Sequence, residues 1–200
     1  MNTFPSHILY LHGFRSSPRS AKAQITGRWV AEHYPDTVWV CPQLPPSPAQ
    51  AMQDIAALVQ AWPAPSSCVI GSSLGGFYAA AVAAQYQWRS VLLNPAVDPA
   101  RDLAKYIGEQ TAWHDPSEAF YFRAEYIEEL RTITANTLAW EQQHTLPPSY
   151  ALICEGDEVL DWREMQARYQ RAQQGILPSN DHAISDFVEH WPEIAKWLGA

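Results

Sequence analysis

The stretch Gly71-Ser72-Ser73-Leu74-Gly75 holds the residue types in this sequence that could most directly do chemistry. It matches the pattern G-x-S-x-G, in which a serine lies on a turn so tight that the residues two before and two after it need to lack side chains. Only Ser73 is flanked symmetrically by glycines, so we interpret Ser73 as a nucleophile and Ser72 as the variable position before it. A helix that begins directly after the serine also offers free backbone N–H groups to a developing negative charge.

A serine hydroxyl is inert without a base, and with this motif the acid and then the histidine are expected to follow the serine along the chain. Of the seven histidines, His182 and His190 lie beyond the last long apolar run. His182 lies in the turn-rich segment LPSNDHAISDF, from which an imidazole can reach back over a sheet. We therefore favour His182 as the base. His190 falls within the expected last helix and is interpreted as a surface or packing histidine.

The acid is expected directly after a strand, and YALICEGDEVLDW offers Glu155, Asp157 and Asp161. Asp157 follows an apolar run and a glycine, where a carboxylate can meet the Nδ1 atom of the histidine. Asp161 fits the N-cap of the next helix, where aspartate is favoured. We therefore choose Asp157, with Asp98 as the second candidate because it also follows an apolar run.

The segment His12-Gly13-Phe14 follows the first apolar run and could supply an oxyanion hole. We expect the backbone N–H groups of Phe14 and Leu74 to point at the substrate carbonyl. His12 is interpreted as a strand-end histidine that holds the loop by a hydrogen bond. The mouth of the site is assigned to Arg15, Ser16 and Ser17. The carboxylates have no metal-ligand spacing and the sequence contains no H-E-x-x-H, so we predict a site without a metal or an organic cofactor.

These residues are expected to be positioned by short apolar runs that alternate with helical patterns. The runs that predict buried strands are residues 7–11, 37–40, 67–70, 90–93 and 150–154, with a short sixth at 175–178. Helices are predicted at about 20–33, 49–61, 74–85, 161–172 and 186–198. This alternation predicts a three-layer αβα domain over residues 1–200, with a mostly parallel sheet of about six strands.

The passage of residues 95–149 separates two predicted strands by far more than a usual crossover. We predict a small helical insertion at about 100–148. Two interpretations stay open: extra helices packed at the side of the sheet, or a cap over the carboxyl ends of the strands. Aromatic residues of this passage could form an apolar acyl site or simply pack in the core: Trp113, Phe120, Tyr121, Phe122, Tyr126 and Trp140.

Composition excludes several classes of partner. Hydrophobic residues make up 47% of the 200, and the formal net charge is −8 with no run of basic residues. This argues against nucleic acid or an anionic membrane surface as a partner. No apolar run approaches the length of a membrane span, and the first residues do not resemble a signal peptide. Cys41, Cys68 and Cys154 are far apart and are interpreted as buried reduced thiols of a cytoplasmic protein.

Several blocks of the sequence, taken together, resemble a known family. They are LYLHGFRSSPRSAKA (9–23), PQLPPSP (42–48), IGSSLGGFYA (70–79), LLNPAV (92–97), GDEVLDW (156–162) and NDHAI (180–184). In this order they are similar to the YqiA-like family of small bacterial esterases. The resemblance implies an α/β-hydrolase fold that starts without the first strands of larger hydrolases. It also implies a serine esterase with Ser73 as nucleophile, Asp157 as acid and His182 as base.

The sequence thus predicts hydrolysis of a small-molecule carboxylic ester through an acyl-enzyme. Thioesters would use the same machinery, and a peptidase or an acyltransferase would share the same three residues. A non-catalytic binding module on a hydrolase fold is the alternative from another class, since a fold can outlast its chemistry. The presence of all three residues favours the enzyme.

Overall fold

The computed structural model of the protein describes residues 3–113, 115 and 117–200. Six parallel strands form its central sheet in the order β2-β1-β3-β4-β7-β8. They are β1 (His7–Leu11), β2 (Val38–Val40), β3 (Ser67–Ser72), β4 (Arg89–Leu93), β7 (Ser149–Cys154) and β8 (Gln173–Leu177). The predicted mostly parallel sheet of about six strands is therefore confirmed. The order reverses between β1 and β3, and ligands of such sheets bind outside the carboxyl ends of the strands at that point.

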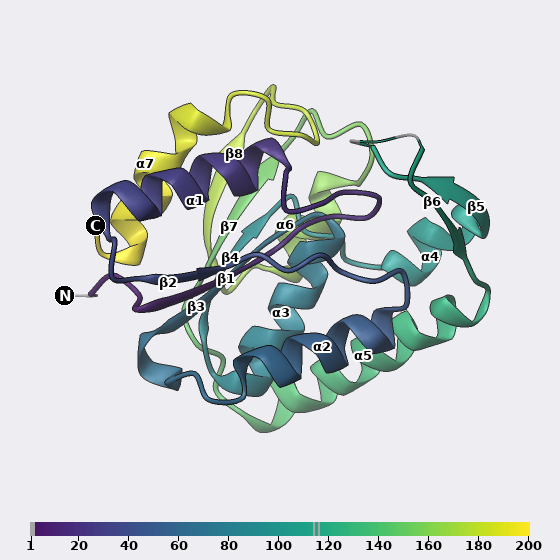
Figure 1. The fold of residues 1–200 in the computed structure, drawn as a ribbon, viewed down its shortest axis with the longest axis horizontal. Coiled ribbons are helices and arrows are strands. Elements are labelled where there is room, and N and C mark those ends of the chain that lie inside the picture. Colours follow the sequence, from purple (N-terminus) through teal and green to yellow (C-terminus); the bar gives the residue numbers. More distant parts are fainter. Residues whose placement is uncertain (1–2, 114, 116) are drawn as a thin grey trace.

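Helices cover both faces of this sheet, which gives the predicted three layers (Figure 1). The long helices are α1 (Ala21–His33), α2 (Pro48–Val59), α3 (Leu74–Tyr86), α5 (Glu125–Gln143) and α7 (Phe187–Leu198). Shorter helices are α4 (Pro99–Leu103), α6 (Trp162–Arg168) and the 3₁₀ turns η1 (Ala64–Ser66) and η2 (Ala104–Tyr106). Helices α1 and α7 pack on one face, whereas α2, α3, α5 and α6 contribute to the core on the other.

The two cores follow from the alternation of side chains along each strand. One core, under α2 and α3, takes Leu9, Leu11, Val69, Leu92, Ala151 and Ile153 from the strands. The other, under α1 and α7, takes Ile8, Tyr10, Ile70, Val91, Leu93 and Leu152. Because both faces of the sheet are buried, these strands are continuous apolar runs in the sequence. The strands could therefore be predicted from the sequence.

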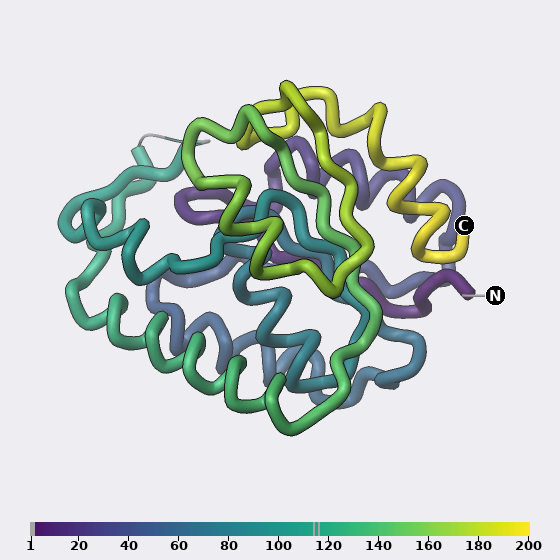
Figure 2. The backbone as a smooth tube through the Cα atoms, turned by 180° about the vertical axis from the view of Figure 1, so that it is seen from behind, coloured from purple at the N-terminus to yellow at the C-terminus, as the bar shows by residue number. Residues whose placement is uncertain are grey.

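The passage between β4 and β7 contains a hairpin in addition to the helices predicted for residues 100–148. Strands β5 (Gly108–Thr111) and β6 (Ala119–Phe122) pair as an antiparallel hairpin, and only the later part forms the long helix α5. The run Ala119–Phe122 is rich in aromatic residues, which favour strands, and its inward side chains are Phe120 and Phe122. Buried residues of α5, Ile127 and Leu130, lie in the same core as α2 and α3. Figure 2 shows α5 running along the molecule, away from the hairpin.

Helix α6 is shorter than the predicted 161–172. It ends at Arg168, and the chain turns over the next residues through a hydrogen bond from the Ala172 amide to the Tyr169 carbonyl. The turn is needed because β8 begins at Gln173, two residues before the predicted start at Gly175. The two ends of the chain meet at Arg89, whose guanidinium donates to the carbonyls of Thr3 and Leu198.

None of the described helices is long and apolar enough to cross a bilayer. All three cysteines are free thiols. Burial raises the pKa of Cys41 and of Cys68 to about 12, and that of Cys154 to about 11. The reactive form of cysteine is the thiolate, so these residues are poor nucleophiles near neutral pH.

Helix α7 allows a test of how much its buried face stabilises the protein. Ile194 is fully buried on this helix, whereas Val188 is 61% exposed on it. Ile194→Ala should lower the free energy of unfolding by about 2–5 kcal/mol, because it leaves a cavity against the strands. Val188→Ala should change it by about 0.5 kcal/mol or less. Urea denaturation measures both, and equal effects would contradict the packing described for α7.

Candidate active site

The turn from β3 into α3 holds Ser73 in a rare backbone conformation, with φ 57° and ψ −122°. Neighbouring glycines make this possible. A Cβ atom on Gly71 would lie 2.1 Å from the Gly75 carbonyl oxygen, and one on Gly75 would lie 2.0 Å from the Leu11 carbonyl oxygen. The second contact shows that Gly75 packs against the end of β1. The glycine spacing thus lets β1, β3 and α3 approach closely around one serine.

The backbone of Ser73 is also held from the neighbouring strand. Its N–H donates to the Leu93 carbonyl at the end of β4, 3.0 Å away. Its carbonyl accepts the amide of Ala96 at 3.1 Å, in addition to the amides of its own helix. A strained residue persists only where the surrounding structure fixes it, and these bonds do so on both sides of Ser73.

The structure brings His182 and Asp157 to this serine. The Nε2 atom of His182 lies 3.0 Å from Ser73 Oγ, and its Nδ1 atom lies 2.7 Å from Asp157 Oδ2. An ionised carboxylate can only accept hydrogen bonds, so Nδ1 carries the proton and Nε2 is free to accept from the serine hydroxyl. The side chain of His182 is 20% exposed and that of Asp157 is fully buried.

Two backbone amides fix the orientation of the Asp157 carboxylate. Its Oδ1 atom accepts from the amides of Val159 and Leu160, each at 2.8 Å. The other oxygen, Oδ2, is therefore left to face the imidazole. The segment after β7 thus forms a turn around its own aspartate, which presents one chosen oxygen to His182.

The loop that carries His182 is held by groups from three other parts of the chain. The side-chain amide of Asn94 donates to the carbonyls of Asp181 and His182, at 3.2 and 3.1 Å. The carboxylate of Glu158 accepts the His182 amide at 3.0 Å. Lys22 Nζ donates to the Ala183 carbonyl at 2.5 Å. Burial lowers the pKa of Lys22 to about 8, opposed in part by the nearby Asp181 and Asp157.

Phe14 and Leu74, the two expected oxyanion donors, both line one cavity of about 410 Å³ beside the serine turn. Leu74 is the first residue of α3, and the first amides of a helix have no partner within it. The ring of Phe14 packs against Tyr106, Phe120 and Phe122, with centroids 5.1–5.9 Å apart. The hairpin therefore supports the loop after β1 from the side.

Apolar residues form much of the wall of this cavity, which also carries the charged residues Arg15, Asp54 and Glu118. The apolar part includes Leu44, Pro45 and Pro46 of the proline-rich loop, together with Tyr78, Ala112 and Phe120. Of the six aromatic residues proposed for an acyl site, only Phe120 lines this cavity. Phe122 is buried in the core, and Trp113 and Tyr121 are largely exposed. Tyr126 packs against Phe122, and Trp140 stacks on His144 in α5.

Other residues singled out in the sequence have structural partners. His12 accepts the Leu44 amide at Nε2 and donates to the Gly13 carbonyl at Nδ1, which holds the proline-rich loop. Asp98 and Asp161 accept backbone amides at the starts of α4 and α6. His190 pairs with Asp186, the residue directly before its helix, at 3.1 Å.

Two of the three residues expected at the mouth of the site line the cavity, and the third does not. Arg15 and Ser16 line the cavity, but Ser17 is buried and accepts the Arg19 amide. Arg15 is itself held: its Nε donates to the Thr111 carbonyl and its guanidinium lies 4.1 Å from the ring centre of Trp113. Glu155, the remaining acidic candidate, is exposed.

Comparison with known proteins places this chain in a family. A family model described as an uncharacterised protein family, UPF0227, matches residues 7–199. The chain belongs to this family. The match covers nearly the whole chain and confirms the resemblance to the YqiA-like family.

Solved structures of α/β-hydrolases share the fold of this UPF0227 member. Est1E from Butyrivibrio proteoclasticus, solved with ferulic acid bound, is similar with a TM-score of 0.75 and 16% identity, over 98% of this chain and 88% of that one. The alpha/beta hydrolase domain-containing protein 10 from mouse has a TM-score of 0.68 and 14% identity, over 100% of this chain and 92% of that one. Esterase Pf2001 from Pyrococcus furiosus has a TM-score of 0.64 and 14% identity, over 98% of this chain and 81% of that one. At these identities the likeness shows the fold.

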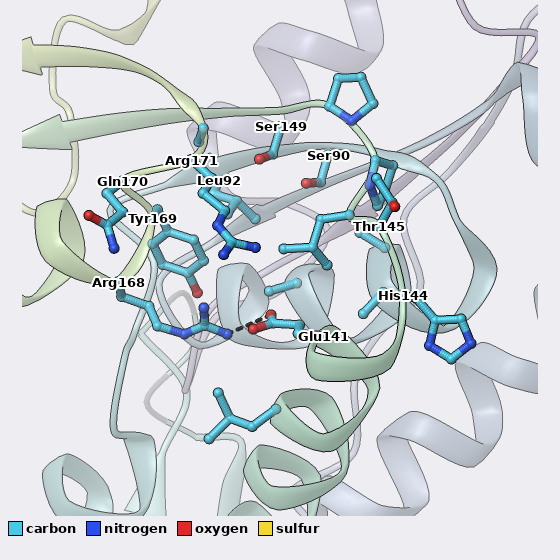
Figure 3. Close-up of a pocket in the computed structure, with 18 of the residues that line it drawn as sticks. Ser90, Leu92, Glu141, His144, Thr145, Ser149, Arg168, Tyr169, Gln170 and Arg171 are labelled. Atoms are coloured by element: carbon cyan, nitrogen blue, oxygen red, sulfur yellow. Dashed lines mark hydrogen bonds and ion pairs between the residues drawn. The ribbon is translucent and has the colours of Figure 1, made fainter.

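Figure 3 shows a larger cavity of about 780 Å³. It lies near the amino ends of β4 and β7, whereas Ser73 follows the carboxyl end of β3. The walls of the cavity include Ser90 and Ser149, at the amino ends of β4 and β7. Arg168 and Glu141 form an ion pair of 2.6 Å there. Their charges neutralise each other, and the cavity contributes nothing to the group around Ser73.

Sequence reasoning missed Asn94, Glu158 and Lys22, which hold the His182 loop. Asn94 directly precedes Pro95 after an apolar run, which is a signal for a polar residue at a strand end. Its φ of 42° and its bonds to a loop 87 residues away could not be read from the sequence. Glu158 and Lys22 carry no pattern that distinguishes them from surface charges.

The glycine spacing at the serine turn can be tested by one methyl group. Gly75→Ala should lower the free energy of unfolding by about 3 kcal/mol or more, because the new Cβ meets the backbone of β1. Gly27→Ala is the control: its Cβ would meet the Trp39 indole at 2.9 Å, which is a side chain that can move. There a change of about 1 kcal/mol or less is expected. Wild-type stability of Gly75→Ala in urea denaturation would contradict the described turn.

Proposed function

We propose that this protein is a serine hydrolase that cleaves carboxylic esters through an acyl-enzyme. The observation that carries the proposal is the continuous chain of contacts from Ser73 Oγ to His182 Nε2, 3.0 Å, and from His182 Nδ1 to Asp157 Oδ2, 2.7 Å. Nucleophile, base and orienting acid are thus within hydrogen-bond reach of one another before any substrate binds.

In the first half of the proposed reaction, Ser73 Oγ attacks the ester carbonyl carbon while His182 Nε2 takes the hydroxyl proton. The imidazolium that forms is stabilised by the Asp157 carboxylate, whose position is fixed by the Val159 and Leu160 amides. The carbonyl oxygen gains negative charge and accepts hydrogen bonds from the amides of Phe14 and Leu74. His182 then gives its proton to the leaving alcohol, and the serine ester remains.

In the second half, water takes the place of the alcohol. His182 Nε2 accepts a proton from the water as the water oxygen attacks the acyl carbon. When the second tetrahedral species collapses, the proton returns to Ser73 Oγ and the carboxylic acid leaves. The side chain of His182 is 20% exposed, which supports access of water to this atom.

The 410 Å³ cavity beside Phe14 and Leu74 is proposed to hold the acyl group. The apolar part of its wall, beside Phe14 and Leu74, favours an uncharged acyl chain or ring. Two structural neighbours support ester chemistry: Pf2001 is an esterase, and Est1E was solved with ferulic acid bound. Thioesters would pass through the same steps, and matched oxygen and thiol esters of one acyl group would separate the two substrates.

The role of Ser73 is tested by comparing two adjacent serines. Ser73→Ala should lower kcat for p-nitrophenyl acetate by about 10⁴-fold or more, because the variant lacks the hydroxyl that forms the acyl-enzyme. Ser72→Ala should retain activity within about threefold, since Ser72 has no assigned step. Steady-state assays measure both rates, with circular dichroism to check the fold. Full activity of Ser73→Ala would eliminate the serine mechanism.

The role of Asp157 is tested by Asp157→Asn. The side-chain oxygen should stay with the two backbone amides, so the new NH₂ group would face His182 Nδ1. That contact favours the tautomer with its proton on Nε2, which cannot accept from Ser73. We expect kcat to fall by about 10⁴-fold, with KM little changed. A decrease below tenfold would show that this carboxylate does not set the tautomer.

A further inference from the structure

We propose that Asn94 is a positioning residue that holds His182 in register with both Ser73 and Asp157. The inference rests on the proposed function and goes beyond it, because Asn94 touches none of the reacting atoms. It lies directly after β4, which is the strand between β3 and β7 in the sheet. Ser73 follows β3, and Asp157 lies three residues beyond the end of β7 at Cys154.

Each polar group of the Asn94 side chain connects two elements of the site. The Nδ2 group donates to the carbonyls of Asp181 and His182, at 3.2 and 3.1 Å. The Oδ1 atom accepts the amide of Cys154 at 2.8 Å. One planar amide therefore links the histidine loop to the end of the strand from which the Asp157 turn departs.

The backbone around Asn94 completes the connection to the nucleophile. The preceding residue, Leu93, accepts the Ser73 amide at 3.0 Å, and Ala96 donates to the Ser73 carbonyl at 3.1 Å. The Asn94 amide itself donates to Leu152 of β7 at 2.9 Å. A displacement of residues 93–96 would therefore move Ser73 and the histidine loop together rather than apart.

The chemistry of asparagine fits this position. Asn94 is fully buried and has a φ of 42°, a backbone region that asparagine tolerates better than most residues. An apolar side chain would leave two carbonyls and one amide buried without these partners, which is costly. Aspartate would keep the acceptor for Cys154 but would lose the donors to the His182 loop. The site thus uses both ends of the amide group.

The consequence for catalysis is geometric. The imidazole needs its Nε2 atom at hydrogen-bond distance from Ser73 while Nδ1 stays with Asp157. Loss of the Asn94 side-chain amide removes the hydrogen bonds that hold the Asp181 and His182 carbonyls. A displacement of about 1 Å in such a group can cost about 100-fold in rate. The acyl cavity does not include Asn94, so substrate binding should change little.

The main test is Asn94→Gly, because glycine accepts the positive φ and removes only the side-chain bonds. We expect kcat for p-nitrophenyl acetate to fall by about 10–100-fold, with KM changed by about threefold or less. Asn180→Ala is the matched control. It removes an amide from the same loop, but one that bonds to Asp186 and His190. Its kcat should change by about threefold or less.

A double-mutant cycle with His182→Ala separates positioning from general structural damage. If Asn94 acts through His182, Asn94→Gly should not lower further the residual rate of His182→Ala, because residues that act as one unit are not additive. The same fold loss in both backgrounds would overturn the inference. So would an unchanged kcat in Asn94→Gly.

Two further measurements keep the test decisive. Should Asn94→Gly fail to fold, Asn94→Asp takes its place in the cycle, because aspartate tolerates the same backbone conformation, keeps the acceptor for Cys154 and replaces the two donors by a carboxylate oxygen that faces the Asp181 and His182 carbonyls. The same kcat loss and non-additivity are expected of it. An inactive Ser73→Ala together with a fully active Asn94 variant overturns the positioning role alone. An active Ser73→Ala overturns the proposed function and this inference with it.

Discussion

The rest of the site depends on the strained conformation of Ser73. A residue held in such a region costs about 1–3 kcal/mol, which the surrounding contacts must offset. Here Gly71 and Gly75 allow backbone atoms to approach where a Cβ would lie 2.0–2.1 Å from a carbonyl oxygen. The Leu93 carbonyl and the Ala96 amide hold the serine from the next strand. Only this geometry lets one hydroxyl project from the edge of the sheet toward an imidazole.

The parallel sheet supplies the remaining groups because its strands all end at one edge. The neighbouring strands β3, β4 and β7 are followed by Ser73, Asn94 and Asp157, respectively. The loop after β8 returns His182 across these ends, and Lys22 at the start of α1 contacts the same loop. Residues far apart in the sequence are therefore brought together by strand order, and the two helical layers bury the faces of the sheet.

The sequence patterns correctly predicted those features that depend on residues close together in the chain. Continuous apolar runs identified the central strands, and the glycines around Ser73 identified the turn. His182 and Asp157 followed from their order along the chain, and the structure brings both to the serine. The β5–β6 hairpin was missed because Ala119–Phe122 lies in a passage whose later part is truly helical. Asn94 was missed because its role depends on a loop contact 87 residues away, which no local pattern encodes.

The central claim is that the Ser73 hydroxyl is a nucleophile activated by His182. Covalent labelling with a fluorophosphonate, followed by mass spectrometry of the proteolysed protein, tests it most directly. A single adduct on the peptide that contains Ser73, absent after mild heat denaturation before labelling, is the predicted result. No adduct on the native protein, or an adduct at another residue with Ser73 unmodified, would contradict the account.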